Sequence, residues 1–305
     1  MKKDLILLIL ILLTMWFNTK GNDVYNHRQS EIDDVAKSKY DKLLDSGIEA
    51  FYKTDWQKAE QIFGDLKQLD KNDPRAYFLD SLIPFWSYFF AGEQEKDAND
   101  FLDISEKAIT LSKSHLTKNP SDTNMVLMLS ALYGYRSLVA ASEKSYSTAI
   151  KSGMTGFKYT RQILSLDSND PRALIGKGIF HYMLGSVPTQ ARWITNMMGL
   201  KGDVEMGLDQ LKQASSSDSY VSIDARMILY YLFEREQRHQ PALEQITYLA
   251  KKYSENLIFQ YKLAECEEEM GNLKSAKDIY RAVSNINNPH LQTLRTKSRK
   301  KLNSI

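Results

Sequence analysis

The sequence is nearly free of cysteine, and its few histidines are scattered. Cys266 is the only cysteine among 305 residues, so the chain cannot form an internal disulfide. The five histidines are far apart, without a His-Glu-x-x-His pair or a Cys/His group at zinc-ligand spacing. We therefore expect no metal site and no cofactor, and a fold that depends on packing.

Motifs for nucleophilic catalysis and nucleotide binding are also missing. There is no Gly-x-Ser-x-Gly sequence, which would mark the nucleophile of a hydrolase. Gly176 and Gly178 lack the third glycine of a dinucleotide-binding fingerprint, and no predicted strand precedes them. This pattern favours helix packing over phosphate binding, so we expect no catalytic residue.

Neither sign of charge dominates, with 40 basic and 38 acidic residues. Nucleic-acid-binding proteins usually carry a strong basic excess, so we expect no nucleic-acid partner. The local exception is the stretch 295–301, which holds Arg295, Lys297, Arg299, Lys300 and Lys301. We favour a solvated, frayed helix end, where cations are stabilised by the helix dipole, over a contact with phosphate or lipid.

The longest apolar run covers 13 residues, from Leu5 to Phe17, and follows Lys2 and Lys3. A transmembrane helix needs roughly 20 apolar residues, so the run favours a secretory signal over a permanent anchor. We predict that residues 1–21 direct export to the periplasm or envelope. Because no Ala-x-Ala cleavage site follows, an uncleaved N-terminal anchor that associates with a membrane stays as the alternative.

The rest of the chain repeats one apolar pattern six times, with apolar or small residues at i, i+3, i+7 and i+10, the spacing of one helix face. The first residues of these stripes lie 45, 45, 58, 35 and 34 residues apart. The stripes are Trp56-Ala59-Phe63-Leu66, Phe101-Ile104-Ala108-Leu111, Tyr146-Ala149-Gly153-Gly156, Val204-Gly207-Leu211-Ala214, His239-Ala242-Ile246-Leu249 and Leu273-Ala276-Tyr280-Val283. The last two spacings match the tetratricopeptide repeat of roughly 34 residues.

These patterns predict an all-α fold, a superhelical array of about six antiparallel helix pairs, with longer helices in the N-terminal repeats. Pro74 and Pro171 should open two helices in near-identical contexts that are 97 residues apart. The helix near 124–142 is apolar nearly all round, so it should be buried. We predict a linker at 22–35, a repeat domain at 36–288 and a basic C-terminal tail at 289–305.

The spacing of 58 residues points to an insertion at 185–203, followed by a helix that Asp203 should cap. Residues around it resemble family 39 of the tetratricopeptide repeat proteins, relatives of the fungal inclusion-body clearance protein, and exported bacterial homologues. The resemblance covers about 74–285 and lies in Gly178, Tyr182, Gly185-Ser186-Val187-Pro188, Gly199-Leu200-Lys201-Gly202-Asp203 and Gly207-Leu208. It implies a helical repeat scaffold without an established catalytic site. Val204 stands where the family often has arginine, so no role of that arginine transfers.

Aromatic residues and nearby cations are the candidates for binding, because tryptophan, tyrosine and arginine contribute most at interfaces. They are Trp86, Tyr133, Arg136, His181, Tyr182, Arg192 and Trp193. Packing in the core of long stacked helices is the competing interpretation of most of them. For 186–198 we predict a short helical lid anchored by Trp193, with a plug between helices as the alternative.

The function predicted from these patterns is that of a non-catalytic, exported scaffold, which binds a protein or peptide in the concave surface that stacked repeats create. A carrier or sensor of an apolar small ligand, enclosed by the long helices and the insertion, is the second hypothesis. An enzyme comes third, since repeat arrays rarely bring an acid, a base and a nucleophile together.

Overall fold

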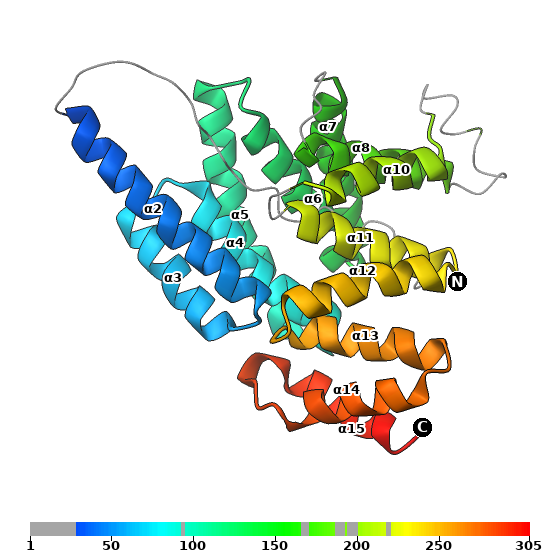
Figure 1. Ribbon diagram of the computed structural model, residues 1–305. Coiled ribbons are helices and arrows are strands. Elements are labelled where there is room, and N and C mark those ends of the chain that lie inside the picture. The colour runs from blue at the N-terminus through cyan, green and yellow to red at the C-terminus, as the bar shows by residue number, and fades with distance from the viewer. Residues whose placement is uncertain (1–28, 93–94, 166–170, 187–192, 194–200, 218–220) are drawn as a thin grey trace. The chain divides into compact units, whose positions relative to one another are not determined.

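The computed structural model describes residues 29–92, 95–165, 171–186, 193, 201–217 and 221–305. This part of the chain is all-α, with 13 α-helices and no strand, and the helices follow one another as antiparallel hairpins (Figure 1). The predicted fold class is confirmed. The predicted signal segment and most of the 185–203 insertion lie outside the described residues. None of the described helices is both long and apolar enough to cross a membrane.

The chain divides into two compact units, and two helices contribute residues to both. Unit 1 covers residues 112–249. It contains the C-terminal part of α5, the N-terminal part of α12 and the described helices between them. The helices are α5 (Glu95–Lys118), α6 (Thr123–Ser142), α7 (Tyr146–Ser165), α8 (Pro171–Gly185), α10 (Val204–Ser215), α11 (Val221–Arg235) and α12 (His239–Lys252). Within this unit α6 packs mainly on α7, and α10 packs on α8 and α11, as expected for stacked hairpins.

Unit 2 is built from two stretches that are distant in sequence, up to Leu111 and from Ala250 onward. Besides the remaining parts of α5 and α12 it contains α2 (Gln29–Tyr52), α3 (Trp56–Leu69), α4 (Pro74–Trp86), the π-helix η1 (Ser87–Gly92), α13 (Leu257–Glu269), α14 (Leu273–Asn285), the 3-10 helix η3 (Pro289–Leu291) and α15 (Gln292–Leu302). Both α15 and η3 pack on η1, so the C-terminal stretch of unit 2 contacts its N-terminal stretch.

Helix starts follow local capping chemistry. The side chains of Asp55, Asp73, Asp203 and Asn256 each accept a hydrogen bond from a backbone N–H in the first turn of the following helix. Such caps satisfy backbone donors that have no partner within the helix. The predicted cap at Asp203 and the predicted helix start at Pro74 are both confirmed.

Most residues of the apolar stripes predicted from the sequence face the core, although Ile104, Leu111, Gly153, Val204 and His239 are only partly buried. Ala59, Phe63, Ala276 and Tyr280 are fully buried, as is most of α6. Leu273, which opens the last stripe, is instead 45% exposed. It is the first residue of α14 and follows the turn at Gly271, so it lies at the edge of the stack, where no further helix pair covers it.

The aromatic stretch Phe85–Phe90 is accommodated by a change of helix type. Pro84 lies inside α4 and has no N–H, and α4 gives way to the π-helix η1 after Trp86. The sequence predicts that these aromatics cannot share one side of one helix. In the structure Phe85, Trp86, Tyr88 and Phe90 are all buried and Phe89 is partly buried, because the wider helix turns them toward several neighbours.

The C-terminal segment is a packed helix, which differs from the frayed end expected from its sequence. Leu294 and Ser298 of α15 are fully buried, and the Lys301 ammonium donates to both carboxylate oxygens of Glu268 on α13. Tyr280 also donates to Glu268, at 2.8 Å. Burial raises the pKa of Glu268, but the hydrogen bonds from Lys301 and Tyr280 outweigh it and hold that pKa below its ordinary value.

We predict that Ala59→Leu and Ala276→Leu each lower the free energy of unfolding by about 1 to 3 kcal/mol, because both alanines are fully buried between helices and extra methylenes overpack the contact. Urea denaturation measures the change. Ala282→Leu, at an exposed position of α14, is the control and should leave the midpoint nearly unchanged. If both core variants unfold like the parent, the repeat register is wrong.

Candidate functional site

The candidate site in unit 1 is organised by the crossing of α8 and α10, where glycines let two backbones touch. A Cβ atom on Gly178 would lie 2.8 Å from the carbonyl oxygen of Gly207, and one on Gly207 would lie 2.5 Å from the carbonyl oxygen of Gly178. Distances below 3.0 Å force the backbone apart. The glycines that carry the family resemblance are therefore packing residues, and they fix where α8 presents His181 and Tyr182.

Tyr182 is fully buried at this crossing, and its side chain extends from α8 toward the end of α11. Its hydroxyl donates to a carboxylate oxygen of Glu236, and the guanidinium of Arg235 lies 5.7 Å from the centre of its ring. Burial, together with the hydrogen bond to Glu236, raises the pKa of Tyr182 well above its ordinary value. Tyr182 therefore stays neutral and ties α8 to the end of α11, rather than facing a ligand.

His181 lies on the neighbouring face of α8 and is partly exposed. Its Nδ1 atom lies 2.9 Å from Oε1 of Gln210 on α10, a hydrogen bond whose direction depends on the tautomer. The ring of Phe180 stacks on Phe157 of α7 at 5.7 Å and also contacts His181. This partly exposed aromatic group consists of Phe157 on α7 and of Phe180 and His181 on α8, and the Gln210 side chain joins it to α10.

Tyr133 and Arg136 lie on α6, and both are partly exposed. The Tyr133 ring stacks on Tyr159 of α7 at 6.1 Å, and the Lys113 ammonium lies 5.1 Å from the centre of the same ring. Burial raises the pKa of Tyr159. Because Tyr133 and Tyr159 are stacked and both partly exposed, they form a second partly exposed aromatic surface on unit 1.

Trp86 is separated from the other predicted binding residues, because it belongs to unit 2. It is 1% exposed and packs edge-on against Phe51, Tyr52, Phe90 and Phe259. In this structure its side chain packs the core.

Of the predicted lid at 186–198, the structure describes Ser186 and Trp193, and Arg192 lies outside the described residues. The indole is 62% exposed. Of the two alternatives weighed for Trp193, an anchor and a plug between helices, the exposed position agrees with the anchor. Whether it binds a partner stays a prediction.

Sequence reasoning missed a set of buried polar contacts in unit 2, where the α2–α3 turn meets the segments around 255 and 288. Thr54 Oγ1 lies 3.2 Å from the carbonyl oxygen of Glu255 and accepts from the N–H of Leu257 at 3.3 Å. The side-chain amide of Asn256 donates to the carbonyl of Tyr52, and that of Asn288 donates to the carbonyl of Thr54. Asn256 is detectable in sequence only as a helix cap, and nothing marks its distant partner.

A cavity of about 300 Å³ lies beside these turns. It is lined by Lys53, Thr54, Asp55, Trp56, Gln57, Glu255, Leu257, Ile286, Asn287, Asn288, Pro289 and His290. Many of its polar groups already have partners: Asp55 caps α3, Lys53 pairs with Glu49, and Asn288 bonds Thr54. These polar side chains therefore hold three turns together, and we assign no ligand to the cavity.

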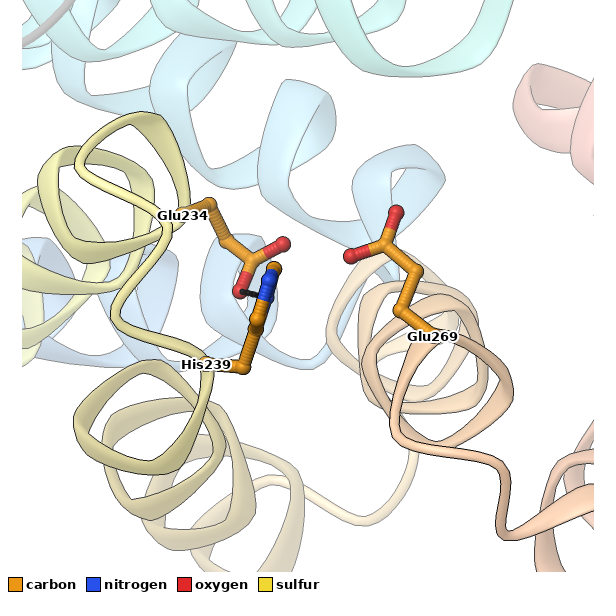
Figure 2. A group of neighbouring side chains, drawn as sticks. All are labelled: Glu234, His239 and Glu269. Carbon is orange, nitrogen blue, oxygen red and sulfur yellow. Dashed lines mark hydrogen bonds and ion pairs between the residues drawn. The ribbon is translucent and has the colours of Figure 1, made fainter.

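Glu234 and His239 flank the turn between α11 and α12, and Figure 2 shows the two side chains facing each other, with His239 Nδ1 3.4 Å from Glu234 Oε1. Glu269, drawn in the same view, belongs to the other unit. A hydrogen-bonded histidine and carboxylate are common in helix turns, so we assign no metal site to these residues.

Comparison with known proteins identifies the C-terminal part of the chain. Residues 172–296 match the family model described as Iml2/Tetratricopeptide repeat protein 39. Over these residues the chain is similar to that family of tetratricopeptide repeat proteins. No curated protein and no solved structure matches it. The matched range begins with α8 and includes the Gly178–Gly207 crossing, and repeat families of this type are generally non-catalytic.

We predict that Gly178→Ala destabilises the protein by at least 1 to 3 kcal/mol, because the added methyl group collides with the backbone of α10. Gly64→Ala in α3 is the matched control: nothing lies within 4 Å of its added methyl group, and alanine is the better helix former. The control should therefore unfold at the same or a higher urea concentration. Equal urea midpoints for Gly178→Ala and the parent would contradict the close backbone contact between α8 and α10.

Proposed function

We propose that the protein is a non-catalytic scaffold that binds a protein or peptide partner on the repeat surface of unit 1. The observation that supports this best is the match of 172–296 to a tetratricopeptide-type repeat family, because such stacked hairpins generally mediate protein interactions. Stacked repeats create extended concave surfaces, and a partner would lie along one of them.

Trp193 marks the part of unit 1 where binding is proposed. Exposed large apolar side chains on this unit also include Met154, Met206 and Tyr248. Tryptophan and tyrosine are both common binding anchors, but one face of the Tyr248 ring is covered by the Arg226 guanidinium at 3.9 Å, so Trp193 is the stronger candidate. Tryptophan buries a large rigid surface on contact and costs little side-chain entropy. The partly exposed aromatic groups around Phe157 and Tyr133 belong to the same unit.

We predict that Trp193→Ala weakens partner capture by roughly 30-fold or more, the effect of losing an interface anchor, and leaves the melting temperature unchanged because the indole is exposed. Immobilised parent and variant are incubated with an envelope extract of the native host, and retained polypeptides are quantified. Met154→Ala, at a residue that is 70% exposed, is the matched control and should retain the same polypeptides as the parent. If the variant has a lower melting temperature but still captures the partner, Trp193 contributes to stability and not to binding.

The second hypothesis, a carrier of an apolar ligand, stays a prediction. Two of the aromatics it would use, Trp86 and Tyr182, are packed against protein groups. Native mass spectrometry after gentle purification separates the two hypotheses: a co-purifying polypeptide supports the scaffold, and a small apolar adduct supports the carrier.

We also propose that the protein is exported to the periplasm or envelope, which the charged start and the apolar run Leu5–Phe17 support. N-terminal sequencing of the protein from its native host should then give a start near Asn22. Full-length protein in the membrane fraction would instead indicate the uncleaved anchor. Recovery of the full-length chain as a soluble cytoplasmic protein would overturn both.

A further inference from the structure

The last two α-helices carry a charge opposite to that of the rest of the chain. Residues 273–302, which include α14 and α15, contain eight basic residues and one acidic residue, Asp278. The remaining residues therefore hold 32 basic and 37 acidic side chains, a net charge of −5 against +7 for the two helices. Such an asymmetry is typical of chains with an anionic partner at one end.

The basic residues of α15 divide into two groups by their contacts. Arg295 donates to the carbonyl of Ser284, and Lys301 bonds Glu268, so both hold the helix in place. Lys297, Arg299 and Lys300 are exposed, and within the described part of the chain no ion pair engages them. They are the cations available to an external partner.

Exposed apolar side chains lie at the same edge of unit 2. The bond between Lys301 and Glu268 holds the end of α15 against the end of α13, two residues before Met270. Met270 is 36% exposed, Leu273 is 45% exposed, and Lys274 beside them is exposed as well. We call Met270, Leu273, Lys274, Arg299 and Lys300 the C-terminal edge; Figure 1 shows α13, α14 and α15 stacked there.

The charge of this edge stays positive after its neighbours are counted. Glu269 is the exposed carboxylate of the same turn, against three exposed cations. Glu267 accepts a hydrogen bond from the Asn272 side chain and keeps its negative charge, whereas Glu268 is paired with Lys301. The edge therefore has three exposed cations, Lys274, Arg299 and Lys300, against the two carboxylates Glu267 and Glu269.

We propose that the C-terminal edge binds the surface of an anionic phospholipid bilayer. Cations beside exposed apolar side chains are the chemistry of interfacial membrane binding, in which the apolar groups enter the boundary of the headgroups and the cations meet lipid phosphates. Nucleic acid would use the charges and leave Met270 and Leu273 in water. This proposal does not depend on the scaffold function.

The test compares binding of the full chain to phosphatidylcholine vesicles with and without phosphatidylglycerol, by co-sedimentation. The triple variant Lys274→Gln, Arg299→Gln, Lys300→Gln, which removes the three cations of the edge, should bind the anionic vesicles on the order of 100-fold more weakly, since each basic residue near an anionic surface contributes about a factor of 5. Its melting temperature should not change, because the three side chains are exposed. The matched control is Lys58→Gln, Lys71→Gln, Lys107→Gln, which removes the same charge from exposed positions of unit 2 and should bind like the parent.

A second measurement separates the edge from the apolar N-terminal segment, which all variants share. Leu273→Cys carries an environment-sensitive dye, and the native Cys266 is buried and does not compete for labelling. The dye emission should shift to the blue on anionic vesicles and not on neutral ones, whereas the same dye at Lys58→Cys should not respond. An unchanged emission at position 273, equal binding of the triple variant and parent, or tighter binding to duplex DNA than to vesicles would each overturn the proposal.

Discussion

A helix hairpin cannot bury its apolar face by itself, and the arrangement of this protein follows from that constraint. The first described hairpin, α2–α3, presents Phe51, Tyr52 and Trp56 at its turn. Two of these rings contact residues more than 200 positions later: Tyr52 stacks on Tyr253, and Trp56 lies edge-on to His290. The backbone carbonyl of Tyr52 also accepts a hydrogen bond from the Asn256 side chain. One compact unit therefore contains segments from opposite ends of the described chain, and its stability depends on both being present.

The buried polar contacts at this junction explain an unusual backbone. Thr54 has φ of 57°, a left-handed conformation that a β-branched residue adopts only at a cost. Glycine would relieve the strain, but it has no hydroxyl to contact Glu255 and Leu257. The hydroxyl also lies 2.7 Å from the Lys53 carbonyl oxygen, and together these contacts offset the strained backbone.

The residues that resemble the repeat family describe the scaffold more than a binding site. Gly178 and Gly207 permit the α8–α10 crossing, and Tyr182 joins that crossing to Glu236. At the other end of the chain, α15 covers α14 and turns its charged face outward, as terminal elements of repeat arrays do. The surfaces available for partners are accordingly those that helix packing leaves exposed, around Trp193 and along the C-terminal edge.

The sequence by itself determined the features that arise from neighbouring residues. The caps at Asp203 and Asn256, the helix start at Pro74 and the buried stripe through Ala59 and Phe63 depend on side chains within a few turns of one another. The all-α class and the succession of helices follow from these signals, whereas the π-helix η1 does not. Only the tertiary structure decided which distant faces meet: that Thr54 contacts Glu255, that Tyr182 is buried while Trp193 is exposed, and that Leu273 is left at an edge. An apolar periodicity states that a face must be covered, but it carries no information about which segment, two hundred residues away, will cover it.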